Sequence, residues 1–304
     1  MSTSAPPAVT SGHFIRVAPD VRLHYASCGA PGAPLMVFLH GFPEFWYAWR
    51  ALLPAFGDRF HAVAPDLRGY NLSDKPADVR AYRPSALVAD IDALVRGLGY
   101  RRCILVAHDW GGAVAWSYAI AHPERVEKLV ILNAPHPLLF ARALAHDAGQ
   151  RAASQYMNWL RRPGSEAALA SDGFALLGDF FLRNGGAAWF HGEVRDAYHA
   201  AWMQPGAIAG GVNFYRASPL HPPSDDDPGA ARMDLAEADF MVQAPTLVIW
   251  GDGDIALRPV LLDGLDRLVA DLHLVRLPEA THWLIHEQPA RVTREIAQFV
   301  GDAG

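Results

Sequence analysis

Short, continuously apolar runs recur along this chain of 304 residues and constrain its fold more than any other feature. They include LMVFLH at 35–40, HAVAPD at 61–66 and RCILVAHD at 102–109. A strand that is apolar throughout is typical of a parallel sheet that is buried on both faces. Segments with helical periodicity separate these runs, as at 84–100. This order predicts an α/β fold with helices on both faces of an open parallel sheet.

Further segments extend the same alternation of strand and helix. The expected strands are 14–17, 21–28, 127–135, 245–254 and 272–278, and the expected helices are 45–55, 110–123 and a final one near 288–300. After Pro137 the alternation stops, and helical patches rich in Trp, Phe and Tyr take its place until about residue 238. We therefore expect an α/β core formed by residues 13–137 and 239–304, with a helical cap inserted at 138–238.

Composition limits the classes of protein to consider. With 51% hydrophobic and 19% charged residues, the chain can bury a large core. The net charge of −6 and the lack of a basic stripe argue against a nucleic-acid partner. No apolar run reaches about 18 residues, so no transmembrane helix is expected. Cys28 and Cys103 stand in apolar runs and are expected to be buried free thiols in a reducing, cytoplasmic compartment.

The first twelve residues, MSTSAPPAVTSG, contain neither Lys nor Arg and have no apolar core. This is not the pattern of a signal peptide, so we expect a short disordered lead.

One strand-to-helix junction carries a carboxylate, in the order Ala107-His108-Asp109-Trp110-Gly111. A residue with small neighbours between a strand and a helix is the pattern of a nucleophile elbow. Such a turn holds the central side chain at the carboxyl end of the sheet, where ligands bind in open α/β folds. The simpler interpretation is that Asp109 only caps the following helix.

Several motifs occur together and in a fixed order: HGFPEFWYAWR (40–50), PDLRGYNLSDKP (65–76), AHDWGG (107–112), LNAPHP (132–137), WGDGD (250–254) and THW (281–283). In this the chain resembles the α/β-hydrolase superfamily, in the branch of soluble epoxide hydrolases and haloalkane dehalogenases, and most closely the epoxide hydrolases. The resemblance implies a mostly parallel eight-stranded sheet flanked by helices, with an inserted helical cap. One departure is Ala107, which stands where the general elbow has Gly.

An aspartate nucleophile suits attack on a saturated carbon. Serine would form an ether there, which water does not readily cleave. A carboxylate forms an ester, which activated water hydrolyses at the acyl carbon, so one difficult step becomes two easier ones. Asp109 therefore disfavours an ordinary serine esterase.

The resemblance implies that His282 is the base for the second step and that Asp254 orients it and stabilises its cation. The alternative position for that acid is Asn133, which has no charge. Asp252 is expected to bond turn backbone, as Asp does in loops. We expect His286 to be a surface or capping residue.

The ester also requires an oxyanion hole. The resemblance assigns this role to the backbone N–H groups of Phe42 and Trp110. His40 is expected to hold the loop by hydrogen bonding, and Pro43 to shape its turn. A plain turn is the simpler interpretation of Phe42-Pro43.

The leaving group distinguishes epoxide hydrolases from haloalkane dehalogenases. An epoxide oxygen requires a proton, and a phenol with a pKa near 10 can supply one as negative charge develops. Asn213-Phe214-Tyr215-Arg216 resembles the second cap-tyrosine motif of epoxide hydrolases, so Tyr215 is one candidate. Tyr156 falls where the first tyrosine is expected, and Tyr198 competes for that role.

Dehalogenases remain an alternative, because they use the same Asp-His-Asp triad. Many haloalkane dehalogenases have Asn where this chain has Phe42, and fluoroacetate dehalogenases have Arg in place of Trp110 and Ala113. A different alternative is a non-catalytic small-molecule receptor on the same fold.

The prediction is therefore an epoxide hydrolase that forms a vicinal diol through an ester on Asp109, with no metal or organic cofactor. Its expected partner is a small apolar epoxide, and its expected state a monomer or homodimer. Cap aromatics suggest an apolar pocket, although most of them are expected to pack in the core of the cap: Trp159, Trp189, Trp202, Phe180 and Phe181.

Overall fold

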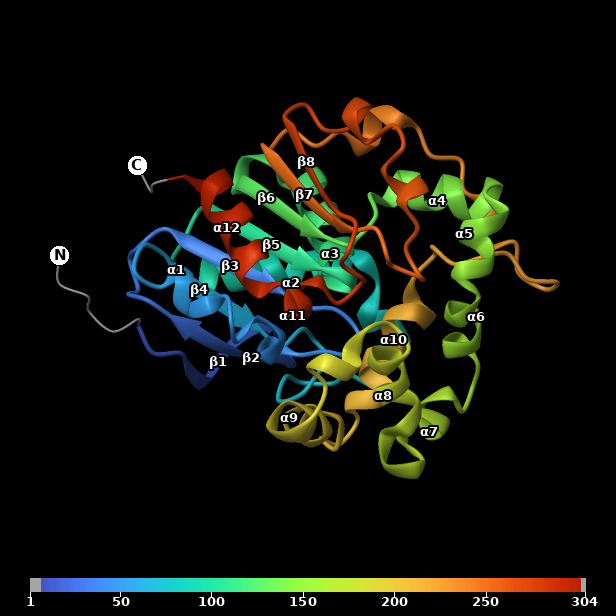
Figure 1. Cartoon of the computed structure of the whole chain (residues 1–304), viewed down its shortest axis with the longest axis horizontal. Helices are drawn as coiled ribbons and strands as arrows, with labels where there is room; N and C mark the ends of the chain where they lie inside the picture. The colour runs from blue at the N-terminus through green and yellow to red at the C-terminus, as the bar shows by residue number, and fades with distance from the viewer. Residues whose placement is uncertain (1–6, 302–304) are drawn as a thin grey trace.

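A computed structural model describes residues 7–301 of the chain, which form one sheet covered by helices (Figure 1). The eight strands are β1 (Thr10–Ala18), β2 (Val21–Cys28), β3 (Leu35–Leu39), β4 (His61–Pro65), β5 (Cys103–His108), β6 (Val126–Leu132), β7 (Thr246–Gly251) and β8 (Leu272–Leu277). Their order in the sheet is β1-β2-β4-β3-β5-β6-β7-β8. The predicted eight-stranded α/β fold is confirmed.

The sheet is antiparallel only at one edge. β1 pairs with β2, and β2 with β4, in antiparallel fashion, whereas every pair from β4 to β8 is parallel. β3 lies between β4 and β5, and β3, β4 and β5 are buried at every residue. Because these strands are parallel, the loops after β3, β5, β6, β7 and β8 all lie on the same side of the sheet, at the carboxyl ends of the strands.

Two layers of helices bury opposite faces of the sheet. The helices of the α/β part are α1 (Leu53–Phe56), α2 (Pro84–Gly97), α3 (Asp109–Ala121), α11 (Leu284–Glu287) and α12 (Pro289–Val300). Val37 and Leu39 of β3 pack in a cluster with residues of α2 and α3, whereas Met36 and Phe38 pack in a second cluster with α1 and α12. Successive side chains of a strand point to opposite faces, which explains this division.

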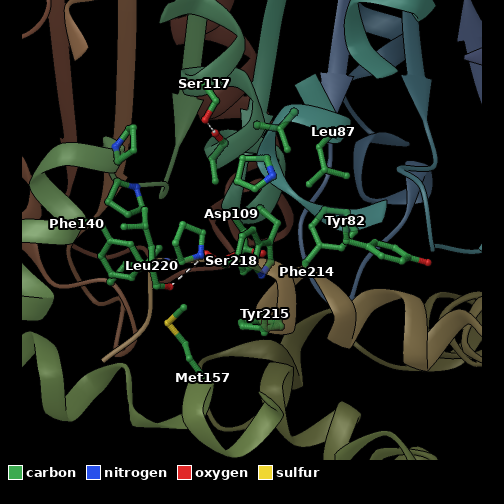
Figure 2. A pocket seen from close by; sticks show the side chains of 18 of the residues that line it. Tyr82, Leu87, Asp109, Ser117, Phe140, Met157, Phe214, Tyr215, Ser218 and Leu220 are labelled. Carbon is green, nitrogen blue, oxygen red and sulfur yellow. Dashed lines mark hydrogen bonds between the residues drawn. The ribbon is translucent and has the colours of Figure 1, made fainter. Parts of the chain in front are cut away.

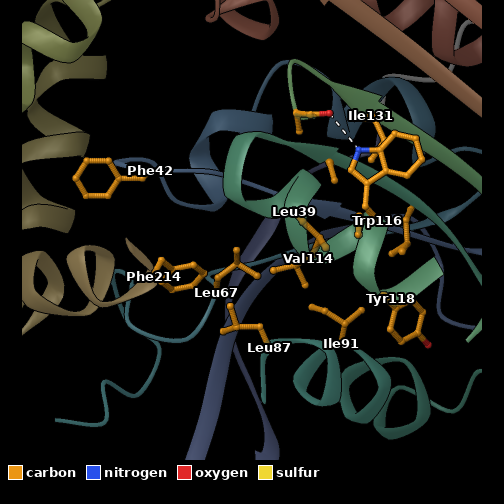
Figure 3. Packing of buried hydrophobic residues seen from close by; sticks show 14 of the residues in the cluster. Leu39, Phe42, Leu67, Leu87, Ile91, Val114, Trp116, Tyr118, Ile131 and Phe214 are labelled. Carbon is orange, nitrogen blue, oxygen red and sulfur yellow. Dashed lines mark hydrogen bonds between the residues drawn. The ribbon is translucent and has the colours of Figure 1, made fainter. Parts of the chain in front are cut away.

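Figure 3 shows the first cluster, in which Leu39 lies beside Val114 and the indole of Trp116. The Trp116 indole N–H donates a hydrogen bond to the carbonyl of Ala134 at 3.1 Å. This bond ties α3 to the loop after β6.

The segment between β6 and β7 is helical, and Figure 1 shows it at one end of the sheet. Its α-helices are α4 (Pro137–His146), α5 (Ala148–Ala153), α6 (Gln155–Arg161), α7 (Ser165–Ala170), α8 (Ala175–Leu182), α9 (Gly192–Trp202) and α10 (Ala207–Ala217). The name cap is used below for residues 138–238, the range that the sequence analysis gave for it, which stays a prediction.

Two local predictions are wrong. Residues 45–55 do not form one helix but a 3₁₀ turn, Trp46–Trp49, followed by α1. Pro54 lacks a backbone N–H and therefore sits in the first turn of a new helix rather than inside a long one. The second concerns the disordered lead predicted for residues 1–12, of which residues 1–6 lie outside the described part of the chain. Thr10–Gly12 are not disordered but belong to β1, where the Gly12 N–H donates to His24 Nε2.

Cys28 and Cys103 are free and buried, as predicted. Among residues 7–301, no helix has both the length and the apolar character that crossing a membrane requires.

Candidate active site

Asp109 lies at the junction of β5 and α3, in a backbone conformation with φ of 50°. This left-handed region is uncommon for residues other than Gly, and strain of this kind is typical of functional sites. The turn is tight, because a Cβ added at Gly111 would collide with the carbonyl of Leu39. A Cβ at Gly41 would collide with the Asp109 side chain itself. Small residues at both positions therefore let the β3 loop approach Asp109.

His282 and Asp254 lie beside Asp109, each from a loop that follows a strand. His282 Nδ1 donates to Asp254 Oδ2 at 2.6 Å, and His282 Nε2 lies 3.7 Å from Asp109 Oδ2. The Asp254 side chain is fully buried, whereas that of Asp109 keeps 13% of its surface exposed. The structure thus brings the three predicted triad residues together, with the imidazole between the two carboxylates.

Asn133, which carries no charge, supports the Asp254 side chain. Its Nδ2 donates to Asp254 Oδ2 at 2.8 Å, and its Oδ1 accepts the backbone N–H of Gly251 at 2.7 Å. The N–H groups of Ala256 and Leu257 donate to the other Asp254 oxygen. Sequence reasoning set Asn133 aside for its lack of charge. Its place at the end of β6, next to β7, was the signal that could have revealed this supporting role.

The charge state of His282 depends on these neighbours. Burial alone lowers the pKa of His282, but Asp254 and then Asp109 outweigh burial and raise it to about 9. Burial also raises the pKa of Asp254, yet the His282 charge and the hydrogen bonds that Asp254 accepts lower it below its usual value. In the free protein near neutral pH, an imidazolium therefore lies between two carboxylates.

The β3 loop contributes the donor nearest to the nucleophile. The backbone N–H of Phe42 donates to Asp109 Oδ1 at 2.7 Å. His40 holds this loop, since its Nε2 accepts the N–H of Leu67 at 3.0 Å and its Nδ1 donates to the carbonyl of Gly41. The carbonyl of Pro43 accepts a bond from Trp202 of α9 at 2.7 Å. The second predicted donor, the backbone N–H of Trp110 in the first turn of α3, stays a prediction.

Two cavities meet at Asp109. The first has a volume of about 290 Å³, and Figure 2 shows Asp109 and Tyr215 on its wall together with apolar residues such as Leu87 and Phe140. The second has a volume of about 390 Å³ and is lined by His282, among other residues. Asp109, Tyr156 and Tyr215 line both cavities. The two tyrosines and the carboxylate therefore lie where the cavities join.

Tyr156 comes from α6 and Tyr215 from α10, and their ring centroids are 6.1 Å apart. Burial, with the charge of Asp109 as a further contribution, raises the pKa of Tyr156 far above its usual value. Burial, Tyr156 and Asp109 likewise raise the pKa of Tyr215. Both phenols therefore keep their protons at neutral pH and can donate them to a bound oxygen.

Tyr198, the competing candidate, lines neither cavity. It is fully buried in α9, and its hydroxyl donates to Glu44 Oε1 at 2.8 Å. Tyr156 is therefore the better placed first tyrosine.

Two predictions for polar residues near the site are wrong. His286 is not a surface residue: its side chain is 1% exposed, because its Nε2 donates to the buried Glu44 at 2.6 Å. Asp252 does not bond turn backbone through its side chain, which instead accepts from Arg276 at 2.9 Å. Glu44 itself was missed. A charged residue directly after HGFP, inside an aromatic segment, was the signal for it.

The cap aromatics divide between cavity and core. Trp159 and Phe180 line the second cavity. Trp189, Trp202 and Phe181 are buried in one cluster, in which Phe181 contacts both indoles.

The fold and this site define a class of protein. Residues 34–289 match the alpha/beta hydrolase fold family, so the chain belongs to that family.

Individual relatives give a narrower description. The chain is 34% identical to epoxide hydrolase 3 of Mus musculus, in a match that covers 99% of this chain and 78% of the relative. It is 30% identical to epoxide hydrolase A of Mycobacterium tuberculosis, over 92% of this chain and 94% of the relative. The crystal structure of an epoxide hydrolase from Bacillus megaterium, in complex with an inhibitor, superposes with a TM-score of 0.86 at 34% identity. That match covers 95% of this chain and 99% of the other. The predicted resemblance to epoxide hydrolases is confirmed.

Proposed function

We propose that this protein is an epoxide hydrolase, which converts an epoxide and water into a vicinal diol through an ester on Asp109. The observation that carries the proposal is the arrangement at the junction of the two cavities. The Asp109 carboxylate and two protonated phenols, Tyr156 and Tyr215, line both cavities there, and His282 Nε2 lies 3.7 Å from the carboxylate. The names of the relatives agree with this activity.

In the first step, one oxygen of Asp109 attacks the less hindered epoxide carbon. Oδ1 accepts the N–H of Phe42, so Oδ2 is the oxygen free to attack. A bond forms between Oδ2 and carbon while the carbon–oxygen bond of the epoxide breaks. The epoxide oxygen takes a proton from Tyr156 or Tyr215, and the product is a β-hydroxyalkyl ester.

In the second step, His282 takes a proton from water, and the resulting hydroxide attacks the carbonyl carbon of the Asp109 ester. The charge of Asp109 is absent from the ester, so one of the groups that raise the pKa of His282 is removed, and the imidazolium can release its proton to solvent and leave the neutral imidazole that acts as base. Negative charge on Oδ1 is stabilised by the N–H of Phe42 and, we propose, of Trp110. The Cγ–O bond then breaks, and the diol leaves with the proton from His282. The Asp109 carboxyl loses to solvent the proton that came with the attacking water, and the phenol and His282 regain theirs from solvent.

The cavities suit a small apolar substrate. Leu87, Val114, Phe140 and Met157 line the first cavity, and Trp159 and Phe180 line the second. A substituent of the epoxide would occupy the first cavity, where it is removed from water.

We further propose that residues 138–238 act as the cap that supplies the two tyrosines, that the core is 13–137 together with 239–304, and that the protein works in the cytoplasm. No metal or organic cofactor takes part in the proposed steps.

The direct test is an assay of the purified protein with styrene oxide and with 1-bromobutane, following diol and bromide. Diol from styrene oxide is the expected result. Bromide without diol would replace the proposal with a dehalogenase. Neither product, together with tight binding of a small molecule, would favour a receptor.

A further inference from the structure

The two cavities that meet at Asp109 differ in the polar groups on their walls. Besides the two proposed acids, the wall of the first cavity carries the hydroxyl groups of Tyr82, Ser117 and Ser218 (Figure 2). Each of these hydroxyls donates its proton to a backbone carbonyl oxygen of the chain, at 2.9, 2.8 and 3.3 Å respectively. Because these protons are already bound, the first cavity suits an apolar substituent of the substrate.

The second cavity is lined by Asn184, whose side-chain amide has no partner. Asn184 borders this cavity together with His282 and Trp283. The residue is only 8% exposed, yet its amide makes no hydrogen bond with any of residues 7–301. A buried amide without a partner destabilises a fold. This indicates that a polar group entering the cavity supplies the missing partner.

The backbone of Asn184 is held against the loop that carries the proposed base. Thr281 Oγ1 lies 2.9 Å from the carbonyl oxygen of Asn184, and Thr281 directly precedes His282. The next residue, Gly185, is packed so closely that an added Cβ would lie 2.6 Å from Glu287 Oε1. The position of Asn184 is therefore set by the same loop that positions His282, as a site for specific recognition requires.

The turn at 183–186 does not itself require an amide. Asn is favoured where the backbone must be left-handed, but here Gly185 takes that conformation, with φ of 86°. Nor does the amide cap a helix, since it bonds no backbone group in the described part of the chain. Local structure therefore gives no reason for Asn at this position, and the cavity does.

The charged groups on the same wall favour a neutral partner for the amide. Asp179 and Arg183 both line the second cavity, and Arg183 donates to Asp179 at 2.9 Å. A carboxylate on the substrate would have to compete with Asp179 for this guanidinium. An amide has both donors and an acceptor, so it can bind a hydroxyl group in either sense.

We propose that Asn184 is a specificity-determining residue that hydrogen-bonds a hydroxyl group on one arm of the substrate. The preferred substrate is then an epoxide with an apolar substituent on one carbon and a hydroxyl-bearing substituent on the other. This deepens the proposed function and rests on it for the chemistry. The apolar arm occupies the first cavity, and the hydroxyl arm enters the second. A site of this kind discriminates against an analogue without the hydroxyl, because the amide of Asn184 then stays unpaired.

The first test compares two substrates that differ in one hydroxyl, trans-3-phenyl-2,3-epoxypropan-1-ol and trans-1-phenyl-1,2-epoxypropane. In Asn184→Leu, which keeps the volume but has no amide, kcat/KM for the epoxy alcohol should fall by about 10-fold. We expect kcat/KM for the compound without the hydroxyl to stay the same. Comparing the two proteins cancels the effect of the hydroxyl on the intrinsic reactivity of the epoxide.

Asn158→Leu is the matched control, because that amide bonds Gln155 and Pro222 within the cap and lines neither cavity. Its ratio of the two kcat/KM values should equal that of the unmodified protein. The midpoint of thermal unfolding should not fall in Asn184→Leu, since the amide has no bond in the folded chain to lose. An unchanged ratio in Asn184→Leu, an equal fall for both substrates or a lower midpoint would each overturn the role of Asn184.

The second test needs no turnover. Calorimetric titration compares the corresponding products, 1-phenylpropane-1,2,3-triol and 1-phenylpropane-1,2-diol. The triol should bind the unmodified protein more tightly, and Asn184→Leu should abolish this advantage. If no epoxide were hydrolysed but the advantage were present, the proposed function would fail and the hydroxyl site would stand. If styrene oxide were hydrolysed but the triol had no advantage, the hydroxyl site would fail and the proposed function would stand.

Discussion

The carboxylates and the imidazole of the site lie just beyond the carboxyl ends of strands of the sheet, whereas the two phenols come from the cap. In the sheet, short bonds fix the polar atoms: His282 donates to Asp254 at 2.6 Å, and Phe42 donates to Asp109 at 2.7 Å. In the cap, packing fixes the ring of Tyr215, whose centroid lies 4.9 Å from that of Trp110 and 5.3 Å from that of Phe42.

This difference separates two parts of the chemistry. In the proposed mechanism, the sheet provides what every ester intermediate on Asp109 requires: nucleophile, base, acid and oxyanion donor. In the same mechanism, the cap provides the proton that the departing oxygen of an epoxide requires. Substitutions of the base or its support in the sheet should therefore slow hydrolysis of the ester, whereas substitutions of the cap tyrosines should slow formation of the ester. The following predictions test that separation.

The largest effect is expected in the sheet, at His282. His282→Gln should lower turnover by about four orders of magnitude or more, because the ester forms but is not hydrolysed. Mass spectrometry of the Asp109 peptide after incubation with styrene oxide should show the added mass of the substrate. His273→Gln, at an exposed position, should turn over normally and show no adduct. An unmodified Asp109 in His282→Gln would refute covalent catalysis.

In the cap, Tyr215→Phe and Tyr156→Phe should each slow ester formation by about 10- to 100-fold, and the double variant by about 1,000-fold, because the leaving oxygen loses its acid. Stopped-flow single turnovers measure this step separately from hydrolysis. Tyr100→Phe provides the control, since that hydroxyl bonds Gly32 and His61 and lines neither cavity. If the double variant formed the ester at the normal rate, the proton would come from elsewhere and the assignment to the cap would fail.

Stability should depend on pH through His282. Its pKa is about 9 in the folded protein and near 6.5 in an unfolded chain, so its contribution is complete below about pH 6.5 and is lost as pH rises through 9. We expect the free energy of unfolding in urea to fall between pH 6 and 9.5 by on the order of 2 to 3 kcal/mol more than in His282→Gln. Equal losses in the two proteins would show that the charge of His282 does not stabilise the fold.

The smallest effect concerns the support of Asp254. Asn133→Ala removes the bond to Asp254 and the bond to the Gly251 N–H, so ester hydrolysis should slow by about 10-fold through loss of orientation. Ester formation should change little, which single-turnover kinetics would show. Asn158→Ala in the cap is the control at a partly exposed amide. Equal slowing of both steps would indicate a general disturbance of the sheet.

Much of this architecture could be predicted from the sequence. Apolar runs between helical segments indicated the parallel sheet, because strands buried on both faces have no polar alternation. The elbow around Asp109 was recognisable because a sharp turn requires small neighbours, as Gly111 shows. Nearly all of this information is local, and it extends over a few residues at a time.

What only the tertiary structure decided is which distant side chains share one buried space. Nothing near His286 or Glu44 in the sequence reveals that they meet, because they are 242 positions apart. The same holds for Asn133 and Asp254, and for the choice of Tyr156 over Tyr198 as the tyrosine on the cavity wall. The sequence by itself determined the order of elements and the chemical types at the strand ends. The physical reason for the division is that periodicity sets local structure, whereas burial and hydrogen-bond satisfaction depend on contacts between segments far apart in the chain.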